Sequence, residues 1–153
     1  MTGGSLKWNK GRGKLGFFQP LLGIWQAETD SDMGTVKCRR TFTRVLDGAY
    51  VQLRAVWELE TGSYKELALF GTGADGRVCF WSFTSDRKQS QGCLADVSDV
   101  HPLAIGFEAE MPAGLARMVY WPSQQDGFYW AVESKTRAGW NRFTEHHYHT
   151  VLE

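Results

Sequence analysis

The chain has 153 residues, a length typical of a single domain. Its 17 basic and 17 acidic side chains give a formal net charge of zero, which argues against a nucleic-acid partner because phosphate binding depends on clustered basic side chains. Hydrophobic residues make up 42% of the chain, too many for a disordered protein, and no segment has the roughly 18 consecutive apolar residues of a membrane span.

The first residues differ in composition from the rest. Residues 1–14 contain four glycines and four basic side chains, and we expect them to form a flexible arm before a single domain over residues 15–153. Residues 14–22 are mostly apolar, but Pro20 disfavours a long helix there. This segment therefore predicts one or two helical turns that cap an end of the domain.

From Ile24 onward, apolar and polar residues alternate with a period of two, which is typical of half-buried strands. Short turns separate the runs, and Asp47-Gly48 is a strong hairpin turn. The alternating runs cover residues 24–29, 35–43, 49–59, 64–71, 78–83, 92–97, 103–109, 115–121, 128–133 and 140–151. About ten strands in sequential hairpins predict an all-β fold, a closed up-and-down antiparallel barrel whose interior is the expected ligand site.

Arg40 stands out in this pattern because it falls on the apolar side of its strand, with Val36, Cys38 and Phe42. A buried guanidinium must be paired or hydrogen-bonded. It either pairs with an internal carboxylate (Glu66 or Glu108) or binds the anionic group of a ligand, since its fork matches a carboxylate. A β-bulge that reverses the alternation would instead turn Arg40 toward water.

The 21 aromatic residues supply the expected walls of the interior (Trp 7, Tyr 5, Phe 9). Those on the side that we interpret as inward are Trp57, Phe70, Phe80, Phe107 and Trp130. Such side chains can serve as the packed core of the barrel or as the surface of a ligand pocket.

The three cysteines, Cys38, Cys79 and Cys93, are odd in number and have no CxxC spacing. They indicate neither a disulfide framework nor a zinc site, and we expect reduced thiols in a cytoplasmic protein. Nucleophile-elbow, P-loop, zinc-protease and dinucleotide-binding motifs do not occur, and no pair of carboxylates suggests acid–base catalysis.

Two segments carry a resemblance to a known fold. Leu22-Gly23-Ile24-Trp25 resembles the GxW motif that opens lipocalin-like (calycin) barrels, and Trp140-Asn141-Arg142 begins the last predicted strand. The resemblance implies that Trp25 stacks on Arg142 and closes the barrel, an arrangement that a cation–π contact would favour. With residues 46–50 and 139–148, the chain is similar to a bacterial lipocalin-like family of unknown function, which implies a fold and no chemistry.

The last strand is also similar to that of nitrobindin, a haem-binding barrel. Residues 144–149 match that strand, and the resemblance implies that His146 would be the iron ligand. The chain departs from the nitrobindin pattern at Gln26-Ala27-Glu28, where alternating glycines would let haem approach the backbone. His147 and His149 share the opposite side of the strand from His146, where we expect an outer, solvated face.

These observations favour a non-enzymatic protein that holds a small, mainly apolar ligand, either neutral or anionic, with Arg40 as its polar anchor. Three alternatives stay open: haem or metal binding through His146, a small-molecule enzyme acting in the cavity, and a homodimer whose interior is incidental. The leading interpretation involves no cofactor, nucleic acid or membrane.

Overall fold

The computed structural model describes residues 8–31 and 34–151, and nearly all of its regular structure is β. One 3-10 helix precedes ten strands, which confirms the predicted fold class. The elements are η1 (Gly16–Leu21), β1 (Gly23–Ser31), β2 (Gly34–Val45), β3 (Tyr50–Leu59), β4 (Gly62–Thr72), β5 (Val78–Thr84), β6 (Gln89–Ala95), β7 (Ile105–Met111), β8 (Gly114–Pro122), β9 (Phe128–Thr136) and β10 (Gly139–Thr150).

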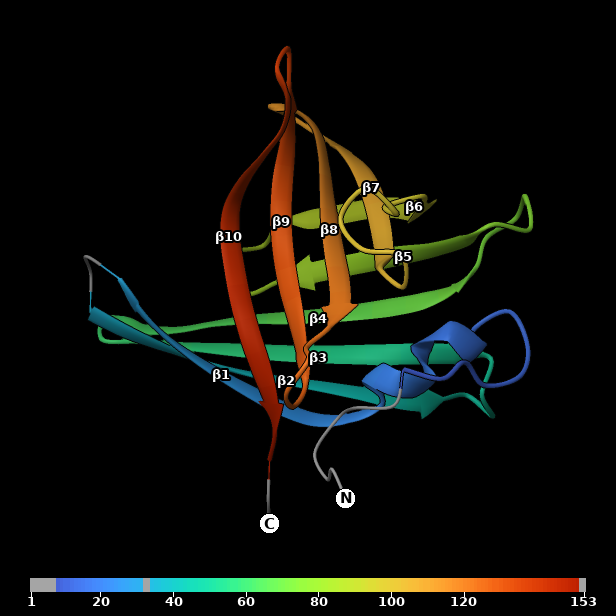
Figure 1. Cartoon of the computed structure of the whole chain (residues 1–153), viewed down its shortest axis with the longest axis horizontal. Coiled ribbons are helices and arrows are strands. Elements are labelled where there is room, and N and C mark those ends of the chain that lie inside the picture. The colour runs from blue at the N-terminus through green and yellow to red at the C-terminus, as the bar shows by residue number, and fades with distance from the viewer. Residues whose placement is uncertain (1–7, 32–33, 152–153) are drawn as a thin grey trace.

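The strands form a closed barrel in which each strand pairs antiparallel with its neighbours in the chain. The seam lies between the first and last strands, where Trp25 pairs with Thr150 and Gln26 with His149. Figure 1 shows β2–β6 running across the molecule and β7–β10 running upright over them. Closure removes the exposed sheet edges, as expected for a meander of this length, and the closed ten-strand barrel is consistent with a calycin-like fold.

The alternation of side chains sets the inside of the barrel. On β2 the buried residues are Cys38, Arg40 and Phe42, and on β3 they include Val51, Leu53 and Ala55. The nine paired positions of β2 and β3 run without a shift from Lys37–Glu58 to Val45–Tyr50, so no bulge reverses the direction of Arg40. Arg40 is 1% exposed and faces inward, which decides between the two directions that the sequence left open.

The short helix caps one end of the barrel, as predicted. Phe18 and Leu21 of η1 are fully buried, and the Trp25 indole Nε1 donates a hydrogen bond to the Leu21 carbonyl at 2.7 Å. The segment before η1 also lies against the barrel, because Trp8 Nε1 bonds to the Leu103 carbonyl and Lys14 Nζ to the Gly76 carbonyl. Residues 8 and 14 of the predicted arm thus contact the barrel, while residues 1–7 lie outside the described residues.

The cysteines differ from the expectation of three reduced thiols. Cys79 and Cys93 occupy directly paired positions on β5 and β6 and form a disulfide, and Cys38 is free and buried. Only the cross-strand register brings the two sulfurs together, so spacing in the sequence could not indicate the bond. The disulfide removes the cysteine argument for a cytoplasmic location, which stays a prediction. No helix within residues 8–31 and 34–151 is long and apolar enough to cross a membrane.

Candidate functional site

The six residues predicted to line the ligand site all lie inside the barrel, but they fall into two groups. Phe70, Phe80 and Phe107 pack together at the end that η1 caps. Arg40, Trp57 and Trp130 lie together farther along the barrel, where the Arg40 guanidinium carbon is 4.3 Å from the Trp130 ring centroid and the Trp57 and Trp130 rings are 5.9 Å apart.

The first group is a packed core. The Phe18 ring of η1 lies 4.7 Å from the Phe70 ring and 6.1 Å from the Phe107 ring, and all three side chains are at most 1% exposed. Phe42 joins the same cluster. The helix thus fills this end of the barrel with its own phenylalanine, so these walls serve packing rather than ligand contact.

Two residues of the second group, Arg40 and Trp130, belong to a set of inward-facing polar and aromatic side chains, which we call the polar core. Its members are Arg40, Glu66, Ser82, Tyr120, Trp130, His146 and Tyr148. Arg40 Nη1 donates to the Tyr120 hydroxyl at 3.1 Å, and Arg40 Nη2 lies 3.8 Å from Glu66 Oε1. The guanidinium also lies 5.5 Å from the Tyr148 ring, so three aromatic rings surround it.

Two nitrogen donors of the polar core have no hydrogen-bond partner among the described residues. They are Arg40 Nε and Trp130 Nε1, and both atoms are buried. A buried donor without an acceptor costs about 1–3 kcal/mol, and more if it is charged. The two donors lie on side chains that contact each other, so this part of the polar core presents hydrogen-bond donors to an acceptor.

Glu66 links the polar core to solvent. Ser82 Oγ donates to Glu66 Oε2 at 2.5 Å, which fixes one carboxylate oxygen, and the Glu66 side chain keeps 23% exposure. Trp57, near the β3–β4 turn, is half-buried. That turn lies toward the other end of β3 from the Phe42–Leu53 pairing, which is beside η1, so the exposed part of the polar core faces the end of the barrel opposite η1.

The protonation states make the polar core a donor-rich environment. Burial raises the pKa of Tyr120 to about 12 and raises the pKa of Tyr148 still further, so both phenols stay neutral at pH 7. Burial lowers the pKa of Arg40, but coulombic interactions led by those with Tyr120 and Tyr148 outweigh it and the pKa is raised overall. At pH 7 the guanidinium is therefore charged, and Glu66 is its anionic partner.

The buried histidine and the buried cysteine are poorly suited to catalysis. Burial lowers the pKa of His146 to about 4, with a further contribution from the nearby Arg40 charge. A group with this pKa is a weak base at pH 7. Burial also raises the pKa of the Cys38 thiol, which keeps it protonated and poorly nucleophilic.

The histidines on the last strand divide as the alternation predicts. His146 is inside, with Nδ1 3.3 Å from the Tyr148 hydroxyl, while His147 and His149 lie outside near Asp126. The His146 ring lies 5.1 Å from the Trp57 ring and 5.2 Å from the Trp130 ring. Both indoles pack against the imidazole that would bind the iron, and buried Ala27 lies on a first strand without the alternating glycines of the haem-binding pattern, so the residues do not fit haem. No cluster of three metal-ligating side chains occurs in residues 8–31 and 34–151.

The depressed pKa of His146 predicts a dependence of stability on pH. The unfolded chain takes up the proton near the ordinary pKa of 6.5, whereas the folded protein does so only near 4. Stability is therefore fully present above pH 6.5 and is lost as the pH falls toward 4. We expect the free energy of unfolding to fall by about 2 kcal/mol from this group between pH 7 and pH 5.

Urea unfolding of the wild type and of His146→Gln at both pH values measures this contribution. The variant should lose that part of the pH dependence, whereas His147→Gln, on the outer face, should keep it. An identical pH dependence in the wild type and His146→Gln would contradict the buried, neutral state of His146.

The pair expected to close the barrel, Trp25 and Arg142, is not formed. Trp25 packs edge-on against Phe128 inside the barrel. Arg142 lies near the start of β10, far along that strand from the Thr150 that pairs with Trp25. It bonds to Glu133 and Glu145 and lies 4.8 Å from the Trp121 ring centroid. The motif residues are present, but the long β10 separates them.

Sequence reasoning missed Tyr120, Tyr148 and Ser82. Tyr148 lies two residues after His146 and therefore points to the same side of β10, so the alternation could have predicted that it faces inward. The contact of Tyr120 with Arg40 depends on the folding of β8 across the barrel from β2, which no local pattern reveals. Glu66 was one of two carboxylates considered as partners of Arg40; the other, Glu108, instead pairs in register with Cys93 and Arg117.

Two hollows lie away from the polar core. One, of about 490 Å³, lies beside β6 and β7 near Gly92 and Glu108. The other, of about 290 Å³, lies between the N-terminal segment and the β6–β7 connection. Neither is lined by Arg40, Trp57 or Trp130.

Comparisons of the chain with models of protein families, with curated proteins and with solved structures found no match. The side chains of the polar core are therefore the basis on which a function can be inferred.

Proposed function

We propose that the barrel binds a small, mainly apolar molecule that carries a carboxylate, and that the polar core holds this carboxylate. The observation that carries the proposal is the pair of unpartnered buried donors, Arg40 Nε and Trp130 Nε1, on side chains in direct contact. A carboxylate accepts hydrogen bonds from such donors and adds a second negative charge beside the guanidinium. Glu66, at 3.8 Å, is too distant to form a short hydrogen bond with Arg40.

The shape of the interior limits the ligand. Phe18 and its neighbours fill the end that η1 caps, so a ligand that reaches Arg40 has to enter from the opposite end of the barrel. The indoles of Trp57 and Trp130 suit contact with the apolar or aromatic part of the ligand. A short aryl or alkyl carboxylate fits this description better than a long lipid.

Binding without catalysis is the simpler function for these residues. The thiol of Cys38 is protonated, His146 is a weak base at pH 7, and the tyrosines keep their protons. Each is suited to hydrogen bonding rather than to proton transfer or nucleophilic attack.

Calorimetric titration with 3-phenylpropionate and with the neutral 3-phenylpropan-1-ol tests the proposal. We expect wild type to bind the carboxylate about tenfold or more tightly than the alcohol, because a charge-assisted pair is worth about 1.5–3 kcal/mol. Arg40→Lys keeps the charge but loses the fork, and should remove most of this preference. Arg39→Lys, the same exchange on the exposed neighbour, is the matched control.

Circular dichroism should confirm that both variants fold, and Tyr120→Phe provides a second, milder change in the polar core. Equal affinity for the carboxylate and the alcohol, or a preference that survives both Arg40→Lys and Tyr120→Phe, would refute the proposal. Titration with hemin is a further arm, and a Soret shift that depends on His146 would favour haem instead. Native mass spectrometry of freshly purified protein should reveal a co-purified small acid.

A further inference from the structure

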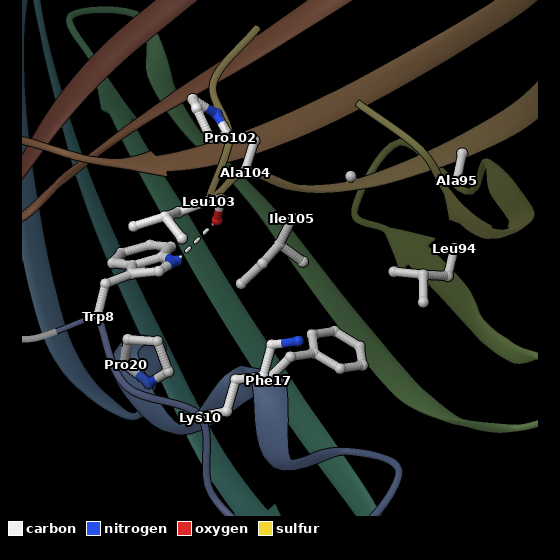
Figure 2. Close-up of a pocket in the computed structure, with 11 residues that line it drawn as sticks. Trp8, Lys10, Phe17, Pro20, Leu94, Ala95, Pro102, Leu103, Ala104 and Ile105 are labelled. Atoms are coloured by element: carbon white, nitrogen blue, oxygen red, sulfur yellow. Dashed lines mark hydrogen bonds between the residues drawn. The ribbon is translucent and has the colours of Figure 1, made fainter. Parts of the chain in front are cut away.

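The smaller hollow has the composition of a binding site of its own. About 290 Å³ in volume, it is bounded by the N-terminal segment and η1 on one side and by the β6–β7 connection on the other (Figure 2). Its lining is apolar or glycine except for Lys10, and the larger apolar side chains in it include Trp8, Phe17, Leu94 and Leu103.

Apolar side chains are exposed at its rim. Leu103 is 53% exposed and Leu94 41%, and both line the hollow. Single exposed leucines are common on protein surfaces, but leucines that meet an indole and a phenylalanine around one depression mark an apolar contact surface. The volume is near the lower limit of small-molecule pockets, which suits a small ligand better than a peptide helix.

The walls of the hollow are held in place before any ligand binds. The Trp8 indole nitrogen donates to the Leu103 carbonyl at 2.8 Å, which joins the two sides and leaves the ring of Trp8 to face a ligand (Figure 2). Phe17 lies 4.6 Å from the Phe18 ring, and so the floor is anchored to the buried core. A rigid site loses less entropy on binding than a mobile one.

Lys10 gives the hollow its charge preference. It is exposed and is the one charged side chain in the lining. No hydrogen bond or ion pair of Lys10 occurs within the described residues, so its ammonium group is available to a ligand.

We propose that this hollow is a second binding site, separate from the barrel interior, for a small amphipathic anion. The alkyl or aryl body of the ligand packs on Trp8, Phe17 and Leu103, and its anionic group pairs with Lys10. The site differs from the polar core in being external and in relying on an exposed ammonium rather than on a buried guanidinium. Its selectivity for anions is therefore weaker and more sensitive to salt.

Octanoate, with about ten non-hydrogen atoms, and neutral 1-octanol are suitable probes. In a titration followed by ¹H–¹⁵N spectra, octanoate should shift the Trp8 indole resonance and the amides of residues 103–106. Lys10→Glu should weaken octanoate binding about five- to tenfold and leave 1-octanol binding nearly unchanged, as expected for loss and reversal of one exposed charge. Lys37→Glu, an exposed lysine on β2, is the matched control.

Leu103→Glu places a charge in the apolar wall and should abolish binding of both probes; because Leu103 is exposed, the variant should fold. The site is refuted if octanoate shifts only interior resonances such as the Trp130 indole, or if Lys10→Glu and Leu103→Glu leave its affinity unchanged. Repeating the titration in Arg40→Lys separates the two proposals, since that variant should lose selectivity for 3-phenylpropionate and keep octanoate at the hollow.

Discussion

Arg40→Met is expected to lower the free energy of unfolding by about 3 kcal/mol and to abolish preference for a carboxylate ligand. The substitution removes a guanidinium that is 1% exposed, bonded to Tyr120 and surrounded by aromatic rings. Methionine fills much of the same volume, so the loss measures charge and hydrogen bonding more than a cavity. It also leaves Glu66 without its internal cation. Urea unfolding at pH 7, followed by tryptophan fluorescence, gives the value.

The double variant Arg40→Met/Glu66→Gln separates the two causes. If the unpaired carboxylate accounts for part of the loss, the double variant is more stable than Arg40→Met, with a coupling energy of about 1 kcal/mol or more. Glu66→Gln alone should also destabilise the protein, because it leaves a buried guanidinium without a counterion. Strictly additive effects would contradict an ion pair across the 3.8 Å that separates these groups.

The fold could be predicted because one strong local signal runs through nearly the whole chain. The alternation of apolar and polar residues placed all ten strands, and the short hairpin turns left a closed meander as the simplest topology. The inward direction of Arg40 and the division of His146 from His147 follow from the same rule. The alternation assigns the correct side only where the strand register has no shift. The shift on β10 lies between Arg142 and Thr144, before the histidines, so it does not change their directions.

Contacts across the barrel could not be predicted in this way. The Cys79–Cys93 disulfide, the Arg40–Tyr120 bond and the position of Arg142 all depend on register or on which strands face each other. Alternation says which side of a strand a residue occupies, but not what it meets there. The expected Trp25–Arg142 pair was wrong because a motif specifies residue types, whereas distance along a twelve-residue strand decides contact.

Arg117→Met should also destabilise the protein by about 3–4 kcal/mol, through a network on the outer wall. Arg117 lies opposite Glu133 across β8 and β9 and bonds to its carboxylate at 2.8 Å. It also forms two hydrogen bonds to Asp99 in the β6–β7 connection and lies 4.1 Å from the Trp140 ring. The variant leaves Glu133, at 4% exposure, with Arg142 as its remaining partner.

Asp99→Asn tests which half of this network matters. Hydrogen bonds from Arg117 hold the pKa of Asp99 below its ordinary value, but the Asp99 side chain is 58% exposed, so this pair should contribute less than about 1 kcal/mol. If Asp99→Asn costs as much as Arg117→Met, the stability resides in attachment of the connection rather than in the buried Glu133. The same connection carries Leu103, so a variant that frees the connection should also weaken octanoate binding at the hollow. The polar core lies on the inner side of the wall and should keep its selectivity for a carboxylate.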